Sequence, residues 1–235
     1  MPIAPRGVGD AARDLLLGGA CVGCARPGRV LCDGCEASLP RRGRLSWPSP
    51  TPAGLVSPYA AGDYDALLKV LVNAHKERGA LALATPLGRV LADVVIGLPG
   101  PAVTPMVLVP VPSRAAVVRR RGHDPMLRVA RVAAGVLRGR GADAWVARLL
   151  VPAGRVRDQA GLDAVDRAAN LAGTMRRRSA VRLGRADRVV VVDDVLTTGS
   201  TVREAQRALE EGGVTVAAVA TVAATVRRLP GATTP

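Results

Sequence analysis

Apolar residues follow two distinct patterns along this chain, and each pattern predicts one kind of element. Uninterrupted apolar runs are typical of strands that are buried on both faces of a sheet. Runs that are mainly apolar in this way cover 106–111, 144–151, 188–193 and 214–222, and few polar residues interrupt them. Apolar positions three and four residues apart indicate amphipathic helices. These cover 63–76, 81–95, 125–137 and the stretch that follows Thr201. Strands that alternate with helices predict an α/β fold with a parallel sheet flanked by helices.

The 235-residue chain carries a net charge of +14, almost all of it from arginine, since Lys69 and Lys76 are the only lysines. Such a charge favours an anionic partner, either a phosphorylated small molecule or single-stranded DNA, unless it reflects a compositional bias toward arginine. Two Trp and two Tyr residues offer few surfaces for stacking bases. No apolar run reaches the roughly 18 residues of a membrane span, so we expect a cytoplasmic protein without membrane insertion.

A Pro-rich stretch divides the chain into two parts of unequal size. Proline and glycine at this density are typical of a linker. We therefore expect an N-terminal cysteine-rich domain over 1–48, a linker over 49–58 and the α/β domain over 59–235.

All four cysteines lie within 15 residues near the N-terminus, as two Cys-x-x-Cys pairs: Cys21, Cys24, Cys32 and Cys35. Four thiolates in this arrangement complete the tetrahedral ligand set of a structural Zn²⁺ and leave no open position for catalysis. Two disulfides or free thiols are the alternatives, and disulfides are disfavoured in the cytoplasm. The two histidines lie outside this cluster, and we expect His75 on the surface at a helix end.

The segment VVVVDDVLTTGST over 189–201 carries the strongest functional signal. Asp193 and Asp194 follow a buried valine run, where the carboxyl edge of a parallel sheet binds ligands. Thr201 and Glu204 form a capping-box pattern at the start of the next helix. The loop between strand and helix offers hydroxyls and backbone N–H groups to an anion. Its residues are Thr197, Thr198, Gly199, Ser200 and Thr201.

A monophosphate suits this amide-lined loop, whereas the two carboxylates suit a ribose diol, a hydrated Mg²⁺, or both. Phosphoribosyl pyrophosphate (PRPP) with magnesium combines these features, and the segment closely resembles the PRPP-binding motif of type I phosphoribosyltransferases. It is not a Walker A loop, because G-x-x-x-x-G-K-[ST] is absent. An ordinary strand–turn–helix with a polar cap is the alternative.

Two further segments suit a phosphorylated ligand. The run Val109-Pro-Val-Pro112 leads through Ser113 and Arg114 into a basic loop with three consecutive arginines. Such a loop offers donors and positive charge to a leaving pyrophosphate. A solvated basic turn is the alternative. The stretch 155–170 is polar and suits a mobile flap, or else an exposed helix. Its candidate residues are Arg155, Arg157, Gln159, Arg167 and Asn170.

The order of these motifs resembles the ComF family, which comprises phosphoribosyltransferase-like proteins associated with DNA-uptake competence. The motifs are the doubled Cys-x-x-Cys, VPVP, RRRG, R-x-x-x-Q, DRAAN and VVDDVLTTGST. The resemblance covers nearly the whole chain. It implies a type I phosphoribosyltransferase-like parallel sheet preceded by a zinc ribbon. It also implies a PRPP loop at 189–201, a pyrophosphate loop at 109–114 and a flap at 155–170.

The chain departs from the related patterns at two places. His123, Asp124 and Pro125 stand where family members carry an aromatic residue, Asn and Gln. Thr197 stands where several phosphoribosyltransferases place an Asp general base, and threonine does not take a proton at neutral pH, so no catalytic residue is assigned. Two functions follow: phosphoribosyl transfer from PRPP–Mg²⁺, or single-stranded DNA binding as an accessory of the DNA-uptake machinery with PRPP or a nucleotide as regulator. The acceptor is not identified.

Overall fold

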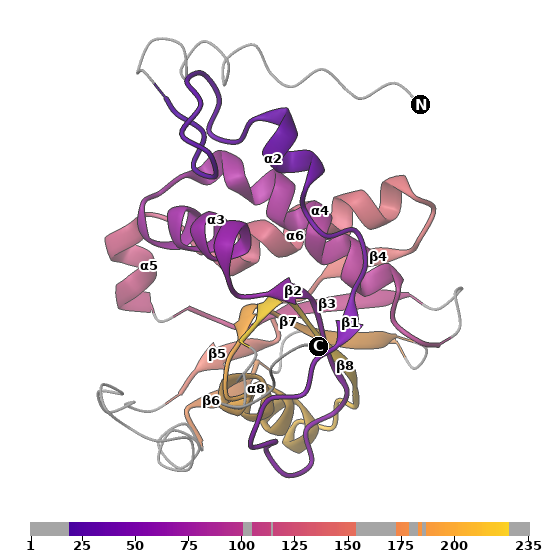
Figure 1. The fold of residues 1–235 in the computed structure, drawn as a ribbon. Helices are drawn as coiled ribbons and strands as arrows, with labels where there is room; N and C mark the ends of the chain where they lie inside the picture. Colours follow the sequence, from indigo (N-terminus) through magenta and orange to yellow (C-terminus); the bar gives the residue numbers. More distant parts are fainter. Residues whose placement is uncertain are drawn as a thin grey trace.

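A six-stranded, mostly parallel sheet forms the centre of the computed structural model (Figure 1). The structure describes residues 19–100, 105–113, 115–153, 173–178, 183–184 and 187–225. The strand order is β1-β2-β8-β7-β3-β4, and only β1 runs antiparallel to its neighbour. The strands are β1 (Arg44–Leu45), β2 (Pro58–Asp63), β3 (Met106–Pro110), β4 (Ala144–Val146), β7 (Arg188–Leu196) and β8 (Val216–Ala224).

Helices cover both faces of this sheet, as the alternating pattern predicts (Figure 1). One face carries α3 (Ala66–Glu77), α4 (Ala84–Ile96) with the 3-10 turn Leu81–Leu83 before it, and α6 (Pro125–Gly139). The other face carries α8 (Ser200–Glu211) and a two-stranded sheet of β5 (Leu150–Pro152) and β6 (Met175–Arg177). Two short helices lie outside these layers: α2 (Asp33–Ala37) and α5 (Ala115–Arg121).

The valine run of β7 is buried on both faces, which confirms the prediction from its continuous apolar pattern. Val189 is 2% exposed, and Val190, Val191 and Val192 are fully buried. Successive side chains of a strand point to opposite faces. Accordingly, Val190 and Val192 join the core beneath α3, α4 and α6, while Val189 and Val191 join the core beneath α8. Burying each such side chain stabilises the fold by about 1.5–3 kcal/mol.

Three expected elements differ from the structure. The single strand expected over 144–151 is two strands in different sheets: Ala147 N–H still donates to Leu108 O, but Arg178 N–H then donates to Leu149 O. The chain leaves the central sheet at its edge, and a mainly apolar run with one arginine does not reveal such a crossing. The expected basic loop after Ser113 contains α5. The helix expected from 63 begins at Ala66, because β2 occupies the preceding residues.

The cysteine-rich segment packs against the main core. Cys21, Leu31 and Leu39 belong to the same apolar cluster as α3 and α4. The segment expected as a linker runs beside α8 before it enters β2 (Figure 1). The domain boundaries stay a prediction. Among the described helices, none has the length and apolar character that crossing a bilayer requires.

Candidate functional site

The acidic pair, Asp193 and Asp194, lies near the carboxyl end of β7. The strand continues to Leu196, three residues beyond the predicted end, because Val195 and Leu196 pair with β8. Both carboxylates are half-buried, and Asp194 N–H donates to Asp193 Oδ1 at 2.9 Å. The pair therefore lies inside the edge of the sheet rather than on a solvated loop.

A lysine from α3 contacts this pair, and sequence reasoning missed it. Lys76 Nζ lies 2.9 Å from Asp194 Oδ2. Burial would lower the pKa of Lys76, but the charge and hydrogen bond of Asp194 raise it above its usual value. Burial, and then repulsion from Asp194, raises the pKa of Asp193 to about 7, although Lys76 opposes that shift. The only available signal was that Lys76 is one of two lysines in an arginine-rich chain.

The stretch predicted to bind phosphate, residues 197–201 and called the phosphate loop below, contains a left-handed glycine directly before α8, and its last two residues lie in the first turn of that helix. Gly199 is the N-cap, with φ 76° and ψ −7°. Thr198 Oγ1 lies 3.0 Å from Ser200 Oγ and accepts from Ser200 N–H at 3.4 Å. An α-helix leaves the N–H groups of its first turn without intrahelical acceptors, and the amphipathic face of α8 is buried as predicted. The loop therefore presents backbone donors beside the acidic pair.

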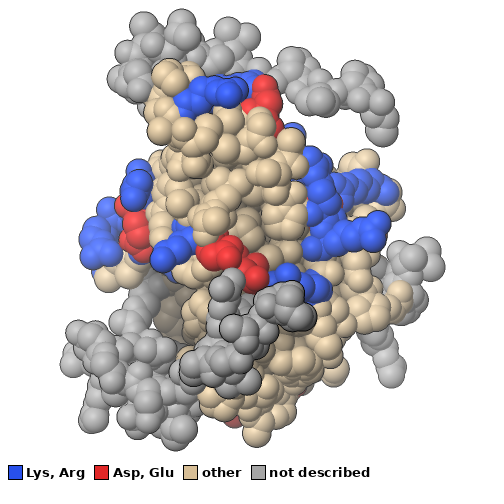
Figure 2. Space-filling view, in the orientation of Figure 1, with Lys and Arg blue, Asp and Glu red and all other residues tan. Residues whose placement is uncertain are grey.

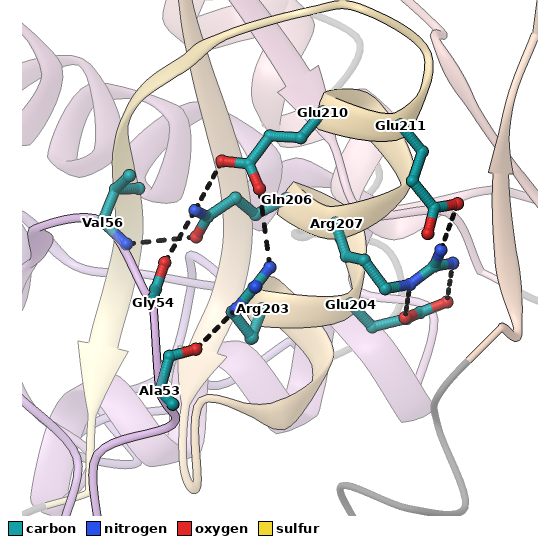
Figure 3. A network of polar contacts seen from close by, with 9 residues as sticks. All are labelled: Ala53, Gly54, Val56, Arg203, Glu204, Gln206, Arg207, Glu210 and Glu211. Carbon is teal, nitrogen blue, oxygen red and sulfur yellow. Dashed lines mark hydrogen bonds and ion pairs between the residues drawn. The ribbon is translucent and has the colours of Figure 1, made fainter.

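The capping box expected from Thr201 and Glu204 does not form. Glu204 is 4% exposed, and its carboxylate accepts from Met175 N–H at 2.9 Å. It also accepts from Arg207 at 2.6 and 2.8 Å (Figure 3). The side chain therefore fastens β6 to α8. The hydrogen bond from Met175 and the ion pair with Arg207 satisfy this buried carboxylate, so it does not reach back to the helix start.

The exit of β3 lies next to the acidic pair. Val111 N–H donates to Val192 O at 3.0 Å, immediately before Asp193. Ser113 is half-buried and follows this contact, whereas Arg114 lies outside the described residues. A cavity of about 360 Å³ opens beside Ser113. It is lined in part by Arg119, Arg148 and Arg178.

The five flap residues lie outside the described residues, so their roles stay a prediction. The strands that flank this stretch are β5 and β6. They place its two ends next to each other, because Pro152 pairs with Met175.

The two histidines lie side by side, contrary to the surface position expected for His75. Its ring is 2% exposed, and its nitrogens lie 3.2 Å from Ala80 O and 3.4 Å from Pro125 O. The ring centroids of His75 and His123 are 5.7 Å apart. Burial lowers the pKa of His75. His75 was misplaced because α6 covers the end of α3, a contact that local sequence does not encode.

The four cysteines converge as their spacing predicts. Their sulfur atoms all lie within 4.8 Å of one another, and Cys24 Sγ is 3.6 Å from Cys32 Sγ. A zinc ion binds sulfur at about 2.3 Å, so this set can hold a structural zinc. Burial favours the neutral thiol at Cys21, yet backbone N–H donors, Cys32 foremost, lower its pKa to about 6. Those donors relieve thiolate charge, as a metal site requires.

Charged side chains on the face shown in Figure 2 form separate groups; acids lie beside bases in several of them, whereas the group at the right is basic. Several arginines are neutralised by neighbours: Arg29 pairs with Asp33, Arg89 with Glu36 and Arg140 with Asp93. All six residues line one groove of about 780 Å³ between α2, α4 and α6. This groove is therefore of mixed charge, which weakens it as a track for a nucleic-acid backbone.

Comparison with known proteins agrees with this site. Residues 146–230 match the family model of the phosphoribosyl transferase domain. The match includes β7 with the acidic pair, the phosphate loop, α8 and β8, and it covers less than half of the chain. It supports a type I phosphoribosyltransferase-like family and function. No curated protein matches the sequence.

Proposed function

We propose that this protein binds PRPP with Mg²⁺ at the carboxyl ends of β3 and β7 and transfers its phosphoribosyl group to an acceptor. One observation carries the proposal. Five residues, 195–199, join the acidic pair to α8; they include the hydroxyls of Thr197 and Thr198 and end at the left-handed Gly199. Carboxylates recognise the ribose diol, and the helix N-terminus attracts the 5′-phosphate. The family match spans both parts.

In the proposed reaction a nucleophile attacks C1 of the ribose while the bond from C1 to the pyrophosphate oxygen breaks. Asp193 and Asp194 hold the ribose hydroxyls, and the loop from Thr197 to Thr201 holds the 5′-phosphate. Ser113 and the adjoining Arg114 would stabilise the negative charge that develops on the departing pyrophosphate. Mg²⁺, when bound with PRPP, supplies charge stabilisation to that leaving group. No general base is assigned, since Thr197 is a neutral, exposed hydroxyl.

The flap and the cysteine cluster take secondary parts in the proposal. Arg155, Arg157, Gln159, Arg167 and Asn170 would close over pyrophosphate and exclude water. Zn²⁺ bound by the four cysteines would hold the N-terminal segment against α3 and α4, a structural part only. ComF-family membership and a cytoplasmic location complete the proposal.

Single-stranded DNA binding within a DNA-uptake complex is the second candidate. The net charge of +14 favours it. Against it stand the mixed charge of the α2–α4–α6 groove and the scarcity of aromatic side chains. Two properties separate the candidates. The affinity for DNA, which rests on phosphate contacts, falls steeply as the salt concentration rises. The affinity for PRPP depends on Asp194.

Calorimetric titration of the full chain tests the two candidates together. We expect PRPP–Mg²⁺ to bind wild type with 1:1 stoichiometry and to bind Asp194→Asn about 10- to 150-fold more weakly, the value of one charge-assisted hydrogen bond. An oligonucleotide that binds wild type and Asp194→Asn equally, with no PRPP binding, would establish the second candidate instead. Pyrophosphate release upon addition of candidate acceptors then reports turnover.

A further inference from the structure

The segment expected as a linker is fixed along α8. We call residues 48–56 the strap. Pro48 is buried, and Leu55 is 7% exposed within the core cluster beneath α8. The strap is thus anchored by apolar contacts at both ends, which a free linker lacks.

Two side chains of α8 bind the backbone of the strap (Figure 3). Gln206 Nε2 donates to Gly54 O at 2.9 Å, and its Oε1 accepts from Val56 N–H at 3.1 Å. Arg203 Nε donates to Ala53 O at 2.9 Å. Gln206 is only 2% exposed, and its second N–H is taken by Glu210 at 2.7 Å. Moving the strap away from α8 would break the hydrogen bonds of this buried Gln206 amide, which costs free energy.

This anchoring places two prolines against the phosphate loop. A β-carbon on Gly199 would lie 2.9 Å from Pro48 Cγ and 3.2 Å from Pro52 Cγ. Ser200, the first residue of α8, is only 6% exposed. The strap therefore fills the space on one side of the N-cap of α8.

We infer that the strap is a fixed wall of the 5′-phosphate pocket, which restricts the site to a terminal phosphate monoester. The inference rests on the proposed function. The acidic pair lies at one end of the loop and the strap contacts Gly199 near the other. When the carboxylates hold a ribose, its 5′-phosphate lies between the acidic pair and the strap. A second ester substituent on that phosphate then collides with Pro48 and Pro52.

Gln206 is then a positioning residue, since it acts on the ligand only through the strap. The wall also separates ligands that share a phosphoribosyl unit. Ribose 5-phosphate and PRPP end in a monoester, whereas every internal nucleotide of a nucleic-acid strand is a diester. The strap thus favours a small phosphoribosyl ligand over a DNA strand at this loop.

The test compares ribose 5-phosphate with its 5′-methyl phosphodiester by calorimetric titration of the full chain. Both prolines are changed together (Pro48→Ala with Pro52→Ala), and Gln206→Leu is made separately, because leucine keeps bulk but forms no hydrogen bond. Glu211→Gln is the matched control: it lies on α8, and its partner is Arg207, away from the strap (Figure 3). Charge alone favours the monoester, so the measured quantity is the change in the monoester-to-diester affinity ratio between variants.

We expect both strap variants to reduce that ratio by about tenfold or more, mainly by gaining diester affinity, and the control to keep the wild-type ratio. Monoester binding with an unchanged ratio in the strap variants would overturn the wall and leave the proposed function standing. Absence of ribose 5-phosphate and PRPP binding in wild type would overturn the proposed function itself. Thermal melts verify folding, and Pro52→Ala alone, at a half-buried position, gives the same ratio test if Gln206→Leu does not fold.

Discussion

Lys76 and Asp194 meet at the carboxyl end of β7, with the ammonium nitrogen 2.9 Å from a carboxylate oxygen. The two side chains come from different layers of the fold, since Lys76 belongs to α3 and Asp194 to the central sheet. Two adjacent carboxylates in a half-buried place repel each other. The positive charge of Lys76 opposes this repulsion and favours the charged form of the pair.

Replacing Lys76 should shift the pH dependence of ligand binding. In Lys76→Gln the acidic pair loses its cation, so we expect the pH midpoint for PRPP–Mg²⁺ binding to rise and Lys76→Arg to restore it in part. The free energy of unfolding should change by about 1 kcal/mol or less, because this pair is partly solvated. Calorimetry from pH 6 to 9 measures the midpoint. Identical midpoints in Lys76→Gln and wild type would contradict the assigned role.

Deprotonation of Asp193 should strengthen the binding of PRPP–Mg²⁺ as the pH rises through about 7. Burial and Asp194 raise the pKa of Asp193 to about 7, so the free protein holds a proton there at pH 6 and loses it by pH 8. Asp193→Asn should remove this dependence, leaving only that of the ligand's own phosphate. A full pH response in Asp193→Asn would rule the residue out as its source.

The same shift predicts a pH-dependent effect on stability, whose sign follows from linkage. The folded chain holds a proton on Asp193 at pH values where the unfolded chain, with a pKa of about 4, has lost it. This contribution is therefore fully present below pH 4 and is lost as the pH rises through 7. Urea unfolding of wild type and Asp193→Asn at pH 5 and 8 measures it: the stability difference between the two proteins should change in favour of the variant at pH 8.

Gly199 should be far less replaceable than Gly213, although both have φ 76°. Nothing lies within 4 Å of a β-carbon at Gly213, whereas one at Gly199 meets Pro48 at 2.9 Å. Gly213→Ala should cost the left-handed strain of about 1–2 kcal/mol and leave PRPP binding unchanged. Gly199→Ala should cost more and weaken PRPP binding. Urea unfolding and calorimetry measure the two variants. Gly213→Ala reports backbone strain alone, and Gly199→Ala reports strain together with the collision against Pro48. Equal losses of stability and of PRPP affinity in both would contradict the close approach of the strap.

A zinc ion in the cysteine cluster should stabilise the main α/β domain as well as the N-terminal segment. Protein purified without added metal should hold about one zinc per chain by elemental analysis. The cluster packs against α3, where a β-carbon on Gly23 would lie 2.6 Å from Leu67 Cδ1. We therefore expect chelation, or Cys24→Ser, to lower the Tm of the main transition rather than only unfold the N-terminus. A Tm that chelation leaves unchanged would exclude a structural zinc.

The sequence by itself determined the elements that depend on local pattern. Continuous valine indicates β7, helical spacing indicates α4, α6 and α8, and the doubled Cys-x-x-Cys indicates a cluster of four cysteines, because each signal lies within one short stretch. The order of Asp193, Asp194 and the phosphate loop likewise predicts the candidate site, since the carboxyl ends of parallel strands form the edge where such sheets bind ligands.

Only the tertiary structure decided which distant residues complete that site. Lys76 reaches Asp194, α6 buries His75 and the strap closes on Gly199 through contacts between elements far apart in the chain. Contacts with different elements also divide the 144–151 run between two sheets. Glu204 binds Met175 and Arg207 instead of capping the start of its own helix. These contacts join groups from elements far apart in the chain, except for the Glu204–Arg207 pair within α8, and burial is a property of the folded whole.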